Sequence, residues 1–255
     1  MTSGLNFTGD AGRLRFWRET RRHDLWYHSF YFDNGYRVRG AYDIGRDIGS
    51  YPFPPLAGLR VLDVGPASGW FSFWFEQHGA EVTALDVAAR ADLDFYAKRP
   101  SFGDLPGASF ETMRRLLNSN VRTVHARVYD VQPSLGIFDL VFMGSVLQHL
   151  RDPIGALMAL RTVCSGILIA TITADPGLDQ YAGPLAALPV LGPERFRNHT
   201  WWIPNRSAFE LWLRASGFAS ADASRTVTLA ADRLRRDINN ATQLQRVGVA
   251  TIEDS

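Results

Sequence analysis

From residue 60 to residue 173 the chain alternates short apolar runs with longer segments whose apolar residues recur at helical spacing. Short apolar runs bounded by turn residues are typical of strands buried on both faces, and the amphipathic segments between them are typical of crossover helices. Five strands joined in this way predict a parallel, doubly wound α/β sheet. The predicted strands are LRVLDVG, AEVTALDV, VRTVHARVYDV, IFDLVFMGSV and SGILIATIT.

Capping residues indicate where the helices begin and end. GWFSFWFEQHG ends at Gly79, a residue type that suits the turn after a helix, and NRSAFELWLRASGF closes on Gly217 in the same way. Pro153 stands in the first turn of DPIGALMALRTVC, where its missing N–H is no loss. Two more apolar runs, 219–229 and 246–252, predict a hairpin at the sheet edge, which brings the strands to seven.

The segments flanking this pattern differ in composition. Residues 1–57 predict an N-terminal lid or extension, with a helix and then a loop in 13–30 and an Asp-Asn-Gly turn between short strands. Residues 174–204 are rich in Pro, Gly and aromatic residues and are too long for a simple connection. We therefore expect a Rossmann-like, mostly parallel domain over 58–255, with a cap inserted at 174–204 after the fifth strand.

Composition excludes several classes of protein. Hydrophobic residues make up 46% and charged residues 21% of the chain, and the formal net charge is +1, so bulk charge does not indicate a nucleic-acid partner. Cys164 is the only cysteine, which excludes a disulfide framework and a cysteine-based zinc site. The histidines and carboxylates lack metal-ligand spacing, so no metal is expected. Without a membrane span or a signal-peptide stretch, a cytoplasmic protein is expected.

The glycines after the first strand of this pattern do not fit a dinucleotide site. That site requires G-x-G-x-x-G, and counting from Gly65 the second and third positions hold Ala67 and Trp70. A bulky indole at the third position opposes the close packing of helix on strand that NAD and FAD folds use. No Gly-Lys-Ser/Thr follows, so a P-loop is also excluded.

The motif present is Asp63-x-Gly65-x-Ala67-x-Gly69, which resembles motif I of the class I S-adenosylmethionine (SAM) methyltransferases, acid-x-Gly-x-Gly-x-Gly. Ala67 replaces the middle glycine. The resemblance covers roughly residues 58–172 and includes Asp139 in the fourth strand. It implies that Asp86 accepts the ribose hydroxyls, that Asp130 contacts the adenine amine beside Val131, and that Met143 and Gly144 line the cofactor. The implied SAM-binding residues are Asp63, Gly65, Ala67, Gly69, Asp86, Val87, Asp130, Val131, Met143 and Gly144.

Two further stretches, WYHSFYFDNGYRVRGAYD and GSVLQHLRDP, resemble methyltransferases related to the wobble-uridine tRNA modifying enzymes. That group includes a carboxymethyl-transferring enzyme, whose cofactor carboxylate needs a basic partner. The basic segment expected before this region does not match here, so ordinary methyl transfer is the favoured interpretation.

The candidate acceptor residues come from three parts of the chain. His149 follows the fourth strand and is the candidate general base if the acceptor is a hydroxyl; the alternative is that it caps the next helix or packs against the lid. Tyr27 and His28 could reach the SAM carboxylate or the acceptor from the N-terminal lid. The insertion contributes the remaining candidates, His199, Trp201 and Trp202, and at most one of the two tryptophans is expected to face the substrate.

Three functions remain open. The favoured one is SAM-dependent O-methylation of a small molecule in specialised metabolism. The second is tRNA methylation of the wobble-uridine type, and the third is a SAM-fold protein that transfers no methyl group. The low net charge and the lack of a separate RNA-binding domain argue against the second. The sequence carries no signal for an oligomeric state or for a membrane partner. The arginines available to an RNA acceptor are Arg13, Arg15, Arg18, Arg21, Arg22, Arg37 and Arg39.

Overall fold

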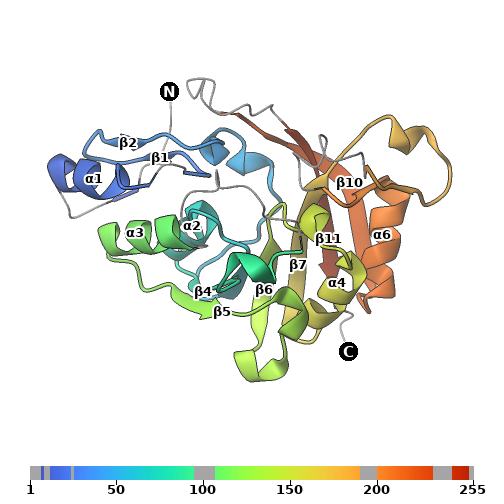
Figure 1. The fold of residues 1–255 in the computed structure, drawn as a ribbon. Helices are drawn as coiled ribbons and strands as arrows, with labels where there is room; N and C mark the ends of the chain where they lie inside the picture. The colour runs from blue at the N-terminus through green and yellow to red at the C-terminus, as the bar shows by residue number, and fades with distance from the viewer. Residues whose placement is uncertain are drawn as a thin grey trace.

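A seven-stranded sheet runs through the centre of the protein (Figure 1). The computed structural model describes residues 7–8, 12–23, 26–94, 107–189, 200–231 and 243–252. The strand order is β10-β11-β7-β6-β3-β4-β5. The strands are β3 (Arg60–Val64), β4 (Glu81–Asp86), β5 (Arg122–His125), β6 (Phe138–Met143), β7 (Cys164–Thr173), β10 (Ser220–Leu229) and β11 (Gln243–Thr251).

The direction of winding reverses between β3 and β6. From β3 the chain adds β4 and β5 on one side, and it then returns to place β6 and β7 on the other side, with all five strands parallel. Both β4 and β6 pair directly with β3. The predicted C-terminal hairpin is confirmed: β11 is antiparallel to β7 and β10, and β10 is the edge strand. In sheets of this kind ligands bind beyond the carboxyl ends of the strands at the point of reversal.

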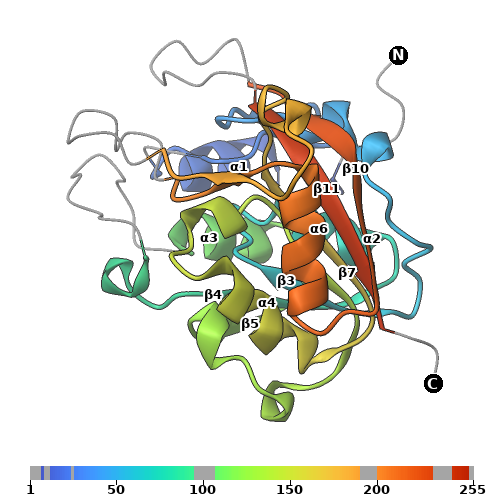
Figure 2. The same ribbon diagram turned by 90° about the vertical axis from the view of Figure 1, so that its right-hand side faces the viewer.

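Helices cover both faces of the sheet (Figure 2). Side chains of successive strand residues alternate between the faces, so Val61 and Phe142 pack with α2 (Trp70–Gln77) and α3 (Ala108–Leu116). Leu62 and Val141 pack on the other face with α4 (Pro153–Arg161) and α6 (Arg206–Ala215). This confirms the predicted layered α/β architecture.

The third strand is shorter than predicted. The apolar pattern extends it to residue 131, but β5 ends at His125, and Val128–Asp130 form the short 3-10 turn η4. β5 ends there because its only neighbouring strand ends there. It is an edge strand that pairs only with β4, and the last pair joins Asp86 to His125. Beyond Asp86 no strand remains to pair with, so the chain turns.

The N-terminal residues form a layer over α2 and α3 (Figure 1). It consists of α1 (Arg13–Thr20), the short antiparallel pair β1 (Phe30–Tyr31) and β2 (Arg37–Val38), and the 3-10 turns η1 (Ile44–Arg46) and η2 (Ile48–Ser50). Most of its aromatic side chains, among them Phe7, Phe16 and Phe30, are buried with those of α2. The ring of Phe7, for example, lies edge-on to Trp70 with the centroids 5.8 Å apart.

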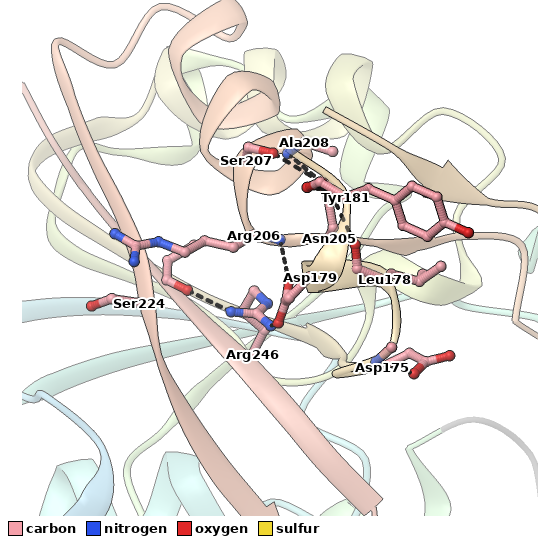
Figure 3. A network of polar contacts seen from close by, with 12 residues as sticks. Asp175, Leu178, Asp179, Tyr181, Asn205, Arg206, Ser207, Ala208, Ser224 and Arg246 are labelled. Carbon is pink, nitrogen blue, oxygen red and sulfur yellow. Dashed lines mark hydrogen bonds and ion pairs between the residues drawn. The ribbon is translucent and has the colours of Figure 1, made fainter. Parts of the chain in front are cut away.

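The described parts of the insertion, 174–189 and 200–204, contain η7 (Leu178–Gln180), β8 (Ala186–Ala187) and β9 (Ile203–Pro204). Asn205, 1% exposed, anchors them (Figure 3). Its side-chain oxygen accepts from the Ala208 N–H, which caps α6, and from the Leu185 N–H. Its amide nitrogen donates to the Gly183 carbonyl at 2.8 Å. The Asn205 side chain therefore caps α6 and also binds the backbone of the insertion.

A partly buried ion pair adds a second anchor (Figure 3). The Arg246 side chain on β11 is 4% exposed and contacts the Asp179 carboxylate in η7. Asp179 also accepts from the Arg206 N–H at 2.8 Å. The insertion is thus fixed to both β11 and α6. No helix within the described ranges is long and apolar enough to cross a membrane.

We expect Asn205→Ala to lower the free energy of unfolding by about 2–3 kcal/mol, because it removes a helix cap and leaves buried backbone groups of the insertion without partners. Asp152→Ala is the matched control, since Asp152 caps α4 through the Gly155 N–H and has no hydrogen bond to the described residues of the insertion. Asp152→Ala should lower the free energy of unfolding by only about 1 kcal/mol. Urea unfolding of both variants measures the difference, and equal losses would contradict the anchoring role.

Candidate functional site

The loop between β3 and α2 lies at the point where the sheet reverses. Gly65, Ala67 and Gly69 have φ values of 70°, 51° and 87°, so every second residue is left-handed and the chain folds back sharply into the helix. Ala67 adopts this conformation with a side chain, at a cost of roughly 1–2 kcal/mol. The rest of the structure must hold the loop in place.

Both glycines are required by close packing as well as by conformation. A Cβ on Gly65 would lie 2.4 Å from Cγ2 of Val146, in the connection after β6. A Cβ on Gly69 would lie 2.4 Å from the ring of Phe73 and 2.7 Å from that of Phe110. The loop is therefore pressed against α3 on one side and against the β6 connection on the other.

The N-terminal layer holds this loop from behind. The Tyr27 N–H donates to Ser68 Oγ at 3.0 Å, and the Trp70 N–H donates to Nδ1 of His28 at 3.4 Å. His28 is 5% exposed, and burial lowers its pKa to about 3, so the ring is neutral and Nδ1 is free to accept. Tyr27 is half-buried. The structure thus gives both of these predicted substrate residues a contact with the loop.

Asp63 lies beneath the loop. It is 2% exposed, and its carboxylate accepts from Oγ of Ser72 on α2 at 2.5 Å. Burial raises the pKa of Asp63 to about 7; the Ser72 hydrogen bond opposes this rise and the Asp86 charge adds to it. The first acid of the motif therefore joins β3 to α2.

Asp86 ends β4 and borders a cavity of about 190 Å³. Pro66 of the loop, Phe110 of α3 and His125 of β5 line the same cavity. The Val87 N–H donates to the Asp86 carboxylate at 2.8 Å. Burial raises the pKa of Asp86 to about 6, against the effects of the Val87 N–H and His125. A half-buried carboxylate beside a cavity is placed to accept hydrogen bonds from hydroxyl groups.

The remaining predicted cofactor residues lie along the same edge of the sheet but differ in exposure. Asp130 is exposed on η4, whereas Val131 is buried. Met143 is fully buried at the end of β6, and Gly144 follows it, where a Cβ would lie 2.7 Å from the Phe142 ring. Asp139 lies at the opposite end of β6 and accepts from the Arg60 N–H at 2.8 Å, joining the starts of two strands.

The insertion docks on the short turn η6 (Leu147–His149), which follows β6 and contains the half-buried His149. The Trp201 N–H donates to the Gln148 carbonyl at 2.6 Å, and the Trp202 indole N–H donates to the Arg151 carbonyl at 3.0 Å. The Trp202 ring packs edge-on against Trp212 of α6. Of the two tryptophans, Trp202 thus has the packing contact with α6. The predicted candidate His199 lies outside the described residues.

Sequence reasoning missed a polar cluster next to His149. Ser145 is left-handed, with φ 62°, and its N–H donates to Oγ1 of Thr171 on β7 at 2.7 Å. Its hydroxyl donates to Oε1 of Gln245 on β11 and accepts from Nε2 of Gln148, both at 2.8 Å. Ser145 and Gln148 fall within the motif GSVLQHLRDP, so their position was a usable signal, whereas Gln245 lies 100 residues away from Ser145 in the chain.

The described residues offer no obvious set of metal ligands. Across the ranges that the structure describes, no three His, Cys, Asp or Glu side chains are grouped so that they could hold a metal ion.

Comparison with known proteins places this site in a family. The family model "Methyltransferase domain" matches residues 36–222. The tRNA U34 carboxymethyltransferase of Pseudomonas paraeruginosa (strain DSM 24068 / PA7) is 30% identical over 178 residues, which cover 67% of this chain and 48% of that protein. The enzyme of the same name from Citrifermentans bemidjiense is 28% identical over 182 residues, covering 68% and 49%. The chain thus spans about half the length of these curated relatives.

Among solved structures, the N-terminal domain of EvdMO1 with SAH bound has a similar fold, with a TM-score of 0.59, 17% sequence identity and coverage of 95% of this chain and 98% of that one. The residues at the carboxyl edge of the sheet also fit the cofactor of the family, SAM. Asp86, a half-buried carboxylate able to accept hydrogen bonds from hydroxyl groups, borders a cavity beside the glycine loop. From its family match and its fold, the chain belongs to the class I SAM-dependent methyltransferases.

Proposed function

We propose that this protein transfers a methyl group from SAM to a hydroxyl group of a small molecule. The observation that carries the proposal is the set of uncharged polar side chains around the turn that contains His149. Ser145, Thr171, Gln148 and Gln245 offer uncharged hydrogen-bonding groups, three of them at least 95% buried, and the Trp201 backbone is bonded to the same turn. Buried, uncharged polar groups suit a small polar molecule better than a phosphate backbone.

The residues that would hold the cofactor surround the glycine loop. Asp86 would accept the ribose hydroxyls, Asp130 would accept from the adenine amine, and Val87 and Val131 would flank the base. The loop 65–69 and the stretch Met143–Gly144 would receive the methionine part. When bound, SAM supplies an electrophilic methyl group on a sulfonium, whose neutral thioether is a good leaving group.

The protein's own task is alignment and removal of one proton. A methyl–oxygen bond forms as the methyl–sulfur bond breaks, and the hydroxyl proton must leave. His149, in the first turn after β6, is the base that would accept this proton. The insertion, bonded to this turn through Trp201 and Trp202, would keep water away from the reacting groups.

One observation favours the alternative, tRNA methylation. Helix α1 presents exposed arginines beside the exposed indole of Trp17, and the Arg21 guanidinium lies 4.3 Å from the centre of that ring. Arginine with an aromatic ring is a common nucleic-acid contact. The curated relatives named above also carry tRNA in their names. The exposed arginines of this helix and the turn after it are Arg13, Arg15, Arg18, Arg21 and Arg22.

Incubation with methyl-labelled SAM distinguishes the two acceptors. The small-molecule panel consists of D-glucose, catechol and D-fucose, the last because a fold relative was crystallised in the presence of SAH and D-fucose. We expect label on a panel hydroxyl and none on total tRNA. Labelled tRNA, together with micromolar binding that weakens steeply with salt, would establish the alternative instead.

The same assay tests the base. His149→Ala should lower turnover roughly 100-fold or more while the SAM dissociation constant measured by calorimetry is unchanged. His78→Ala, at an exposed position at the end of α2, is the control. Turnover of the His149 variant near that of the control would assign His149 to packing.

The glycine loop gives a prediction for cofactor affinity. Gly65→Ala should weaken SAM binding about tenfold or more, because its Cβ would strike Val146 and its left-handed backbone would be strained. Adding Val146→Ala removes the struck methyl group and should recover most of the affinity. Calorimetry measures both variants, with circular dichroism as the check on folding. A double variant no better than Gly65→Ala would mean that the contact with Val146 does not shape the loop.

The raised pKa of Asp86 predicts a pH dependence of SAM binding. The ionised carboxylate accepts hydroxyl groups best, and a pKa of about 6 means that it is protonated as the pH falls through that value. SAM should therefore bind about tenfold more weakly at pH 5 than at pH 8. Asp86→Asn should bind weakly at both pH values with little difference between them. A pH dependence that persists in this variant would have to come from another group.

A further inference from the structure

We propose that Gln148 recognises the acceptor: its side-chain oxygen Oε1 accepts a hydrogen bond from a donor group beside the methylated hydroxyl, and a chain of hydrogen bonds ending at Tyr42 holds the amide in the orientation that this requires. The inference rests on the proposed function and specifies its substrate class. It predicts an acceptor with a second hydrogen-bond donor beside the methylated hydroxyl.

The starting observation is an unpaired atom. Gln148 is 3% exposed, and its Oε1 is buried with no hydrogen-bond partner among the residues that the structure describes. Buried carbonyl oxygens of this kind are normally satisfied, because leaving one unpaired loses its bond to water without replacement. The other atom of the same amide, Nε2, donates to Ser145 Oγ at 2.8 Å. One atom of the amide is thus paired, and the other has no partner among the described residues.

A series of hydrogen bonds, which begins at Nε2 of Gln148, fixes the orientation of the amide. Ser145 Oγ donates to Oε1 of Gln245 at 2.8 Å. Nε2 of Gln245 donates to Oε1 of Gln243 at 3.1 Å, and Nε2 of Gln243 donates to the Tyr42 hydroxyl at 3.0 Å. The series begins in the turn after β6, crosses to β11 and ends in the N-terminal layer. Gln245 is 1% and Tyr42 5% exposed.

Every donor in this series points the same way, from Gln148 toward Tyr42. Turning the Gln148 amide alone would bring its oxygen against Ser145 Oγ, whose single proton already goes to Gln245. All links would have to reverse together. The series therefore holds Oε1, an acceptor, at the unpaired end, and the group that completes it must be a donor. A hydroxyl supplies that donor, whereas an ether or a carbonyl does not.

The position of Gln148 connects this end to the reaction. The residue immediately precedes His149, and its own carbonyl receives the Trp201 N–H. The unpaired oxygen thus belongs to the turn that carries the proposed base and on which the insertion docks. The proton of the methylated hydroxyl goes to His149 in the proposed reaction, so the donor that Gln148 binds is a neighbouring group of the same molecule. Sites built around such a bond discriminate strongly against molecules that lack the donor.

Binding to the SAH complex tests the proposal without requiring turnover. The probes are D-fucose, D-glucose and catechol, titrated into the ¹⁵N-labelled protein saturated with SAH. We expect at least one probe to shift the side-chain amide signal of Gln148, assigned as the signal that Gln148→Met lacks. That variant should bind the same probe at least tenfold more weakly, with an unchanged SAH dissociation constant. Gln77→Met, at an exposed position at the end of α2, is the control and should match the native protein.

Tyr42→Phe tests the series itself. It removes the last acceptor and should shift the Gln148 amide signal in the absence of any probe, although the two residues are joined only through Ser145, Gln245 and Gln243. An unmoved Gln148 signal in this variant would show that the series does not orient the amide. Native affinity in Gln148→Met, or no probe that moves the Gln148 signal, would overturn the recognition role.

The proposed function fails in a different way. If SAH binds and the Gln148 signal responds but no label reaches any hydroxyl, methyl transfer to small molecules is wrong while the recognition site stands. If label is transferred equally by Gln148→Met and the native protein, only the recognition site is wrong.

Discussion

The left-handed backbone at Gly65, Ala67 and Gly69 is the constraint on which the rest of the site depends. It turns the chain from β3 directly into α2, so that the loop lies at the point of sheet reversal, beside Asp86. A conformation of this kind persists only where the surroundings enforce it. Here the N-terminal layer does so, through the Tyr27 N–H on Ser68 and the His28 ring on the Trp70 N–H. The N-terminal layer is therefore part of the structure that holds the loop.

Much of the fold follows from local pattern. Buried strands and amphipathic helices have distinct periods, which is why β3, β4, β6 and β7 and the helices between them could be predicted. The motif from Asp63 to Gly69, taken together with the acids at the later strand boundaries, was sufficient to indicate the family. The end of β5 was not predictable, because it is set by the length of the neighbouring strand rather than by its own residues.

The parts of the site that could not be predicted depend on contacts between distant segments. Gln148 and Gln245 meet through Ser145 only because β11 lies beside β7, and β7 beside β6. Neither glutamine belongs to a periodic pattern. For the same reason the sequence could not show that the ring nitrogen of His28 accepts from the Trp70 N–H. Residue type indicated the chemistry that was available, and the tertiary structure determined where it is used.

The central claim is that the edge formed by the glycine loop, Asp86 and the turn containing His149 is one methyl-transfer site. A crystal structure of the protein with SAH tests this most directly. The account predicts the ribose hydroxyls on the Asp86 carboxylate and the sulfur directed toward the turn that carries Gln148 and His149. SAH bound elsewhere, or bound with its sulfur directed away from that turn, would contradict it.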